Sequence, residues 1–352
     1  MPETSAEDVA FWTDHCVPPY ASLLRSTGTY TEEQIDDHVK WFKEFIIPAI
    51  GPKPKAGAAY LMAHTGSIIE ISVNFSDNRN PIIRFIFQPM DSIKSIPNSV
   101  NADMSWFEQF AAVFCVPEAD LPALKAKLPP QIASIPNCLL GFDLDKASRS
   151  MKAYFSPLYK HLLTGENTDK VIFDLMKSLR PAGQGFEPAL KLLEDFRSAE
   201  QVRNIDVVGF DCIKPEAGAR IKLYTRLAPG ENTFAHVEHH LTLGGRLTDG
   251  LTLKEVELLR DIWHLLLDEP EGFAQRTSSK TETDLQSPHS GMMVSWEVQS
   301  GNPLPSPKLY VPRWTFTNSN KNIAEGYEKI FDKWGWGWGA NGKYRRTIEE
   351  AL

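Results

Sequence analysis

The sequence predicts an α+β protein built from a repeated unit, in which a pair of antiparallel strands is followed by about two helices. Three observations predict this class. Runs of alternating apolar and polar residues occur in four pairs. Segments with apolar residues at helical spacing follow each pair. The same order then returns along the chain, as in proteins built from a repeated supersecondary unit. Because tightly joined strands run antiparallel, this order excludes a doubly wound fold with parallel strands.

The first unit opens with a helix predicted over residues 31–47. Thr31 and Gln34 have the spacing of a capping box, and Pro48 with Gly51 supplies the stop signal. Strands are predicted next over 67–75 and 82–88. Since side chains alternate across a strand, one face of the first strand carries Ile69, Ile71, Val73 and Phe75, and the other carries Glu70, Ser72 and Asn74. Helical stretches follow over 104–114 and from residue 118.

Three further units repeat this order. Strand pairs are predicted at 138–144 with 151–155, at 205–212 with 220–227, and at 292–298 with 309–314. Helices are predicted over 169–179, 187–196, 233–241, 253–267, 323–334 and 344–352. Thr252 and Glu255 are interpreted as the capping box of the helix at 253–267. The polar stretch 277–290 is predicted to be a mobile loop within a unit. No linker divides the chain, so we expect one domain over 1–352.

Composition limits the possible functions. The 352 residues include 37 basic and 45 acidic groups, for a net charge of −8, and 42% are hydrophobic. An acidic chain is not typical of nucleic-acid binders, and no apolar run is long enough to span a membrane. The first residues lack the pattern of a signal peptide, and the four cysteines show no C-x-x-C pair. These features favour a soluble, cytoplasmic protein with reduced thiols.

The second strand of each pair carries a cation at a similar place: Arg84, Lys152, Lys222 and Lys308. Period-2 geometry puts further polar residues on the same faces, namely Tyr154, Arg220, Tyr224 and Tyr310. Such faces commonly meet solvent. Here, however, helices flank every strand pair and must cover the apolar faces, which carry Met151, Ala153, Phe155, Ile221, Leu223 and Thr225. We therefore expect the cationic and phenolic faces to line an interior.

An interior with several cations and tyrosines suits an anionic ligand with an organic part. Lys and Arg would bind a diphosphate, which would compensate cations that are costly to bury unpaired. Tyrosine rings stabilise an organic cation through their π faces. Together these residue types indicate chemistry on an allylic diphosphate, in which diphosphate leaves and a carbocation is kept from water.

Five segments of the sequence resemble the fungal aromatic prenyltransferases of the dimethylallyltryptophan synthase type. They are HTGSIIEIS at 64–72, IRF at 83–85, MKAYFSP at 151–157, RIKLYT at 220–225 and KLYVP at 308–312. The resemblance covers nearly the whole chain in order and spacing. It implies the ABBA prenyltransferase barrel, an antiparallel barrel of α-β-β-α units with the helices outside. It also implies transfer of a dimethylallyl or longer prenyl group to an aromatic, indole-containing acceptor.

The resemblance assigns roles to particular residues. Diphosphate would be held by Arg84, Lys152, Arg220, Lys222 and Lys308. The allylic cation would be shielded by Tyr154, Tyr224 and Tyr310. Glu70 matches the glutamate that accepts a hydrogen bond from the indole N–H, and we take it as the candidate catalytic base. The reaction would be an electrophilic aromatic substitution, in which the cations stabilise the departing diphosphate and the bound acceptor lies close to the carbocation.

No metal or other cofactor is expected. The sequence Asp36-Asp37-His38-Val39-Lys40 lacks the last acid of an aspartate-rich metal motif and lies within a predicted helix. His236, His239 and His240 have helical spacing, but no fourth zinc ligand is evident. The run Trp334–Gly339 contains G-x-G-x-G, yet no strand precedes it, so a packed aromatic loop is expected.

The family pattern continues with a fifth strand pair, whereas this chain ends at Leu352. We therefore expect a C-terminally short domain with four of five strand pairs, and weak or absent transferase activity. An open sheet edge would favour pairing with another chain, for example in a homo-oligomer. Two alternatives stay open at this point: a prenyl diphosphate cyclase on the same fold, and a non-catalytic barrel that binds an isoprenoid or aromatic ligand.

Overall fold

The computed structural model describes residues 4–54, 67–76, 80–90, 92–128, 135–200, 204–228, 231–271, 290–317 and 319–351. The fold divides into two compact units. The first comprises Met1–Gly165, Gly209–Ala217 and Arg346–Leu352, and the second comprises Glu166–Val208 and Gly218–Arg345. Residues 64–66 of the first family-like segment, and all of the predicted 277–290 loop except Ser290, lie outside the described residues.

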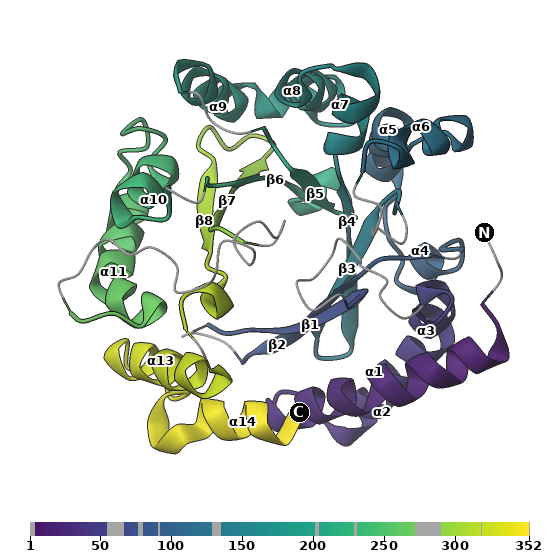
Figure 1. The fold of residues 1–352 in the computed structure, drawn as a ribbon, viewed down its shortest axis with the longest axis vertical. Coiled ribbons are helices and arrows are strands. Elements are labelled where there is room, and N and C mark those ends of the chain that lie inside the picture. The colour runs from purple at the N-terminus through teal and green to yellow at the C-terminus, as the bar shows by residue number, and fades with distance from the viewer. Residues whose placement is uncertain are drawn as a thin grey trace. The chain divides into compact units, whose positions relative to one another are not determined.

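The first unit contains four antiparallel strands, each paired with the next in the chain (Figure 1). They are β1 (Ile69–Asn74), β2 (Ile82–Phe87), β3 (Leu139–Asp145) and β4 (Ser148–Phe155). In their register Arg84 lies opposite Asp143, and Gly141 lies opposite Lys152. Strand β5 (Val207–Asp211) contributes its last three residues to this unit. The predicted strand pairs at 67–88 and 138–155 are confirmed within a few residues.

Helices α1 to α7 belong to the first unit, together with two short helical segments. Their bounds are α1 (Ala6–Ser26), α2 (Glu32–Trp41), the π-helix η1 (Phe42–Ile46), α3 (Ile47–Ile50), α4 (Ile96–Ser99), α5 (Ser105–Phe114), the 3₁₀ segment η2 (Glu118–Asp120), α6 (Leu121–Lys125) and α7 (Leu158–Thr164). The predicted capping box of Thr31 and Gln34 is present at the start of α2. The helix predicted over 31–47 contains a π-helical turn from Phe42 to Ile46.

Helix α1 was not among the predicted elements, and it contains Pro18 and Pro19, although proline usually ends a helix. Its apolar face is regular, with buried side chains four residues apart at Trp12, Cys16, Tyr20 and Leu24. A capping box of Ser5 and Asp8 starts the helix. Burial of this face outweighs the hydrogen bonds lost at the two prolines.

Aromatic side chains form much of the core of the first unit. Phe85 on β2 stacks on Phe142 of β3, with 5.1 Å between the ring centroids. Phe42 approaches Phe85 at 5.2 Å and stacks on Tyr20 of α1 at 4.5 Å. The same side of β4 buries Met151, Ala153 and Phe155. Helices therefore cover the apolar face of these strands, as expected, and the polar side chains lie on the other face.

The second unit contains the antiparallel strands β6 (Arg220–Arg226), β7 (Met293–Gln299) and β8 (Ser306–Tyr310). Its helices are α8 (Thr168–Ser178), α9 (Glu187–Ala199), α10 (Phe234–Leu241), α11 (Gly250–Leu267) and α13 (Asn320–Lys333), and α14 (Lys343–Ala351) begins in it. The indole N–H of Trp296 on β7 donates to the His240 carbonyl of α10, at 3.2 Å. Ile221, Leu223 and Thr225 are buried on this side of β6, as expected.

Two expectations for the second unit are wrong. Helix α11 begins earlier than predicted, because the Asp249 carboxylate accepts from the Thr252 N–H at 2.9 Å and Thr252 lies inside the helix. An aspartate at this position caps the helix, and its negative charge interacts favourably with the positive end of the helix dipole. Strand β8 covers Ser306–Tyr310 and not 309–314, because pairing with β7 starts at Ser306 and Pro312 offers no N–H.

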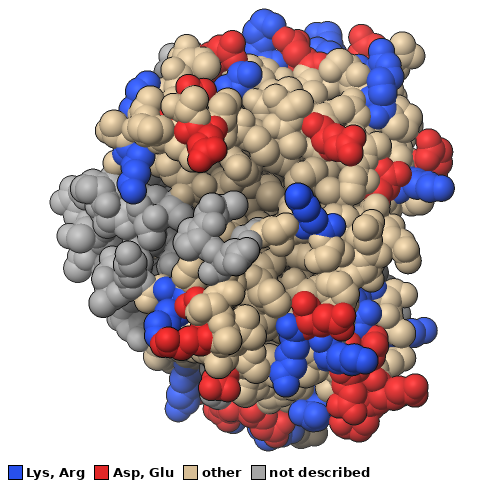
Figure 2. All heavy atoms as spheres, turned by 90° about the vertical axis from the view of Figure 1, so that its right-hand side faces the viewer, with Lys and Arg blue, Asp and Glu red and all other residues tan. Residues whose placement is uncertain are grey.

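Charged side chains of both signs lie on one face of the molecule (Figure 2). On the face drawn in Figure 2, acidic and basic side chains are interspersed among uncharged ones. Within the described residues, no helix combines the length and apolar character needed to cross a bilayer.

Candidate active site

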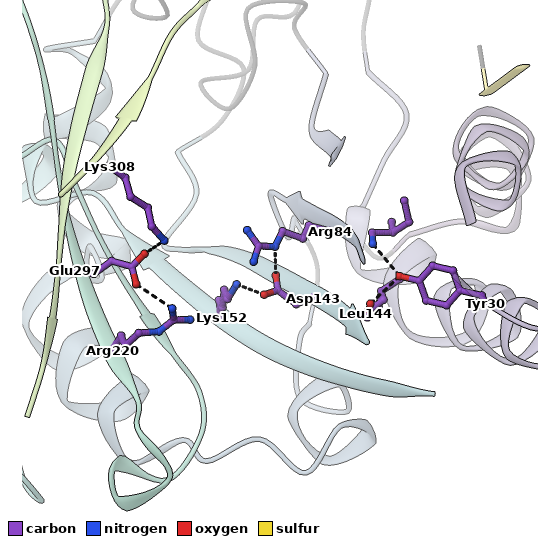
Figure 3. Close-up of polar contacts among 9 residues, drawn as sticks. Tyr30, Arg84, Asp143, Leu144, Lys152, Arg220, Glu297 and Lys308 are labelled. Carbon is purple, nitrogen blue, oxygen red and sulfur yellow. Dashed lines mark hydrogen bonds and ion pairs between the residues drawn. The ribbon is translucent and has the colours of Figure 1, made fainter. Parts of the chain in front are cut away.

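The predicted cations of the first unit meet at one carboxylate (Figure 3). Arg84 Nε lies 3.1 Å from Asp143 Oδ1, and Lys152 Nζ lies 2.5 Å from Asp143 Oδ2. Asp143 belongs to β3, the strand between those that carry the two cations. Directly opposed residues of antiparallel strands share a face, so the register places all three side chains on the polar face of these strands. The predicted placement of Arg84 and Lys152 on one face is confirmed.

The second unit repeats this arrangement with a different acid (Figure 3). Arg220 Nη1 lies 3.0 Å from Glu297 Oε2, and Lys308 Nζ contacts Glu297 Oε1. Glu297 belongs to β7, between the strands that carry the two cations. Lys222 is buried and lies opposite Glu297 in the β6–β7 register. The four charged groups therefore share the polar face of the second unit.

Two of the predicted tyrosines lie next to each other in the second unit. The rings of Tyr224 on β6 and Tyr310 on β8 have centroids 5.7 Å apart and planes inclined by 51°. Tyr224 is buried, whereas Tyr310 is 38% exposed. Each lies two residues after a cation of the same strand face, Lys222 and Lys308. Aromatic faces are thus held beside positive groups.

The third tyrosine lies between two glycines of the first unit. A Cβ atom added to Gly141 on β3 would lie 3.1 Å from Tyr154 Cε2, and one added to Gly209 on β5 would lie 2.6 Å from Tyr154 Cε1. Both distances are shorter than ordinary van der Waals contact. The ring of Tyr154 therefore occupies space that is available only because both neighbours lack a side chain.

Glu70 lies on β1, on the same face as Arg84. Ser72 is opposite Arg84 in the β1–β2 register, and Glu70 is two residues from Ser72. Its side chain is reached by solvent, yet the surrounding protein displaces enough water to raise the pKa of its carboxyl group. A ligand can therefore reach the Glu70 carboxyl group, while the surrounding protein favours its neutral form.

The histidine cluster has local hydrogen-bond partners. His240 Nδ1 lies 2.8 Å from the His236 carbonyl oxygen, and His239 Nε2 lies 3.3 Å from Glu200 Oε1. Desolvation lowers the pKa of His240. In the part of the chain that the structure describes, no group of three His, Cys, Asp or Glu side chains is arranged to hold a metal ion.

A family profile described as tryptophan dimethylallyltransferase matches residues 8–346, nearly the whole chain. The chain belongs to this family.

Individual members of the tryptophan dimethylallyltransferase family support the assignment. The indole diterpene prenyltransferase terF of Tolypocladium album is 31% identical, over 100% of this chain and 88% of the relative. The indole prenyltransferase tdiB of Emericella nidulans is 30% identical, over 97% of this chain and 87% of the relative. The chain is accordingly an aromatic prenyltransferase.

Solved structures share the fold of this prenyltransferase. The crystal structure of AnaPT from Neosartorya fischeri superposes with a TM-score of 0.80 at 22% identity, covering 97% of this chain and 85% of that one. The structure of NotF in complex with brevianamide F and DMSPP gives a TM-score of 0.80 at 21% identity, covering 99% and 87%. These identities support the fold alone.

Two kinds of site residue in this prenyltransferase were not predicted. The acids Asp143 and Glu297 lie on the first strand of a hairpin, 9 and 11 residues before the lysines that they contact. An acid on the first strand of each hairpin, 9 or 11 residues before the lysine of the second strand, was a usable sequence signal. Gly141 and Gly209 carried a weaker signal, because a glycine inside a strand often marks a close approach of another group.

Proposed function

We propose that this prenyltransferase transfers a dimethylallyl or related prenyl group from an isoprenoid diphosphate to an indole-containing acceptor. The proposal rests chiefly on one observation: Lys152 and Tyr154 share a face of β4, with Arg84 beside Lys152 through Asp143. Groups suited to a diphosphate and to an allylic cation thus lie two residues apart. The relatives named as indole prenyltransferases support the acceptor class.

In the proposed reaction, the cations bind the donor and stabilise the departing diphosphate. The assigned residues are Arg84, Lys152, Arg220, Lys222 and Lys308. They supply charge-assisted hydrogen bonds, which are stronger than neutral ones. As the carbon–oxygen bond breaks, negative charge grows on the leaving group, so fixed cations stabilise the transition state more than the ground state.

The tyrosine rings protect the carbocation in this proposal. Tyr154, Tyr224 and Tyr310 offer π faces, each contributing about 0.5–2 kcal/mol to a bound cation. The rings also exclude water, which would otherwise capture the carbocation as an alcohol. Addition of the acceptor ring forms the new carbon–carbon bond, and loss of a ring proton restores aromaticity.

Glu70 is proposed to bind the acceptor as a carboxylate. It would accept a hydrogen bond from the indole N–H and so make the ring more nucleophilic. A carboxyl group with a raised pKa is a stronger base than an ordinary glutamate. This supports the further proposal that Glu70 removes the ring proton.

The closed ABBA barrel, formed by one domain over 1–352, is also a proposal. Its supports are the order of the strands, which follows the chain from β1 to β8, and the likeness to AnaPT and NotF. In this arrangement the polar strand faces would line the lumen and the helices would lie outside.

The test is an assay with dimethylallyl diphosphate and a panel of indoles and phenols, read by diphosphate release and mass spectrometry. A prenylated indole is the expected product. Release of diphosphate with a terpene alone would favour a cyclase. Binding of dimethylallyl diphosphate without release of diphosphate, whichever acceptor is added, would favour a non-catalytic barrel. Either outcome would overturn the proposed function.

A further inference from the structure

Two carboxylates contact cations that are assigned to the diphosphate in the described residues, one carboxylate in each unit. Asp143 contacts Arg84 and Lys152, and Glu297 contacts Arg220 and Lys308. Both groups have the same order along the chain: an arginine on one strand, an acid on the next and a lysine on the third. We call each group a trio. A diphosphate site needs positive charge, so an acid in both trios requires an explanation.

Burial shows that the acids are built into the strand faces. The Asp143 side chain is 15% exposed and that of Glu297 is 6% exposed. The arginines are more exposed, at 37% for Arg84 and 39% for Arg220. A buried carboxylate without a partner is costly, as is a buried lysine such as Lys152. Each acid therefore neutralises one charge of its trio and leaves a net charge of +1.

We infer that Asp143 and Glu297 set the charge of the diphosphate site, so that it binds the donor and still releases inorganic diphosphate. This inference rests on the proposed function. Within each trio the acid lowers the summed charge of the two cations from +2 to +1. A diphosphate group is anionic, so a change of one charge in a trio changes the electrostatic attraction between the trio and the ligand. The acids thus moderate the positive charge that each trio presents to the ligand.

The inference predicts a gain of affinity on removal of an acid. Asp143→Asn and Glu297→Gln keep the shape of the side chain but raise the net charge of their trio by one. Electrostatic attraction should then tighten binding of inorganic diphosphate by about tenfold at low ionic strength, with a smaller gain at high salt. Slower diphosphate release should lower kcat and strengthen product inhibition by a similar factor.

The experiment measures calorimetric Kd values for inorganic diphosphate and kcat for the same full-length proteins. Asp143→Glu should restore the wild-type Kd, because it returns the charge. Asp195→Asn is the matched control, since Asp195 forms an exposed ion pair with Lys191 on α9 and its loss should leave the Kd unchanged. Thermal unfolding checks that each variant is folded.

The outcomes separate the inference from the proposed function. Lys152→Met should weaken diphosphate binding. If it does not, the diphosphate assignment fails and the inference with it. If Lys152→Met weakens binding but folded Asp143→Asn and Glu297→Gln bind no tighter than wild type, only the inference is overturned. If neither acid variant folds, the acids are needed for the stability of the protein, and the inference is overturned in that case too.

Discussion

The ring of Tyr154 on β4 fills the space beside Gly209 on β5, so that a Cβ atom on Gly209 would lie 2.6 Å from Tyr154 Cε1. The ring is confined on its other side by Gly141. The orientation of Tyr154 thus depends on two residues that have no functional group of their own.

Gly209→Ala should displace the Tyr154 ring and lower prenyl transfer at least tenfold. The added methyl group also overpacks the strand, which typically costs about 1–3 kcal/mol. Steady-state kinetics and urea unfolding would measure the two effects. Gly250→Ala is the matched control, because a Cβ atom there would meet nothing within 4 Å. Wild-type activity in Gly209→Ala would contradict the proposed role of the ring position.

Tyr224→Phe should keep most of the activity, whereas Tyr224→Ala should lower it by about 10- to 100-fold. The π face stabilises the cation and survives in phenylalanine, and its loss removes about 0.5–2 kcal/mol of cation stabilisation and admits water. The measurement is the ratio of prenyl alcohol to prenylated acceptor, which should rise only in the alanine variant. Equal ratios in both variants would argue against a shielding role.

Glu70→Gln should remove the acid limb of the pH profile of kcat/KM. Desolvation raises the pKa of Glu70, so activity that needs the carboxylate should fall at a higher pH than for an ordinary glutamate, whose pKa is about 4.3. An unchanged acid limb in Glu70→Gln would assign that limb to another group.

The same substitution should change stability in the opposite direction to activity. A raised carboxyl pKa favours folding below the unfolded-state pKa, and this contribution is lost as pH rises through the folded-state pKa. Glutamine stays neutral throughout. Glu70→Gln should therefore unfold at a temperature equal to or above that of the wild type near pH 8, with the difference vanishing in acid. A lower melting temperature near pH 8 would contradict this expectation.

Tyr30→Phe should destabilise the first unit by about 1–3 kcal/mol. The Tyr30 hydroxyl accepts from the Ile83 N–H at 2.8 Å and donates to the Leu144 carbonyl at 2.7 Å (Figure 3). These two residues are opposite each other in the β2–β3 register, next to Arg84 and Asp143. Removal of the hydroxyl would leave two buried backbone groups unpaired. Urea unfolding measures the change.

Tyr20→Phe provides the control for that experiment. Tyr20 is also buried in the first unit, but its hydroxyl has no hydrogen-bond partner among the described residues. Its removal should change the free energy of unfolding by less than about 0.5 kcal/mol, or stabilise the protein. Equal losses in the two variants would show that ring packing, and not the Tyr30 hydroxyl, carries the effect.

Local signals predicted most elements, and they failed where two signals competed. Thr252 and Asp249 are both good N-cap residues, and the structure starts α11 after Asp249. No helix was predicted over α1, which contains Pro18 and Pro19 and buries a regular apolar face. The free energy of burying that face depends on the rest of the unit and cannot be read from a short window of sequence.

The sequence by itself determined which side chains share a strand face. Alternation is a property of the extended backbone, so Lys152 with Tyr154 and Lys222 with Tyr224 could be grouped without coordinates. Only the tertiary structure decided which groups meet across strands. Asp143 lies between Arg84 and Lys152, and Glu297 between Arg220 and Lys308, because of the register of three strands. Register depends on turns and on packing against helices far along the chain, so the contacts of each acid with its two cations could be established only from the fold.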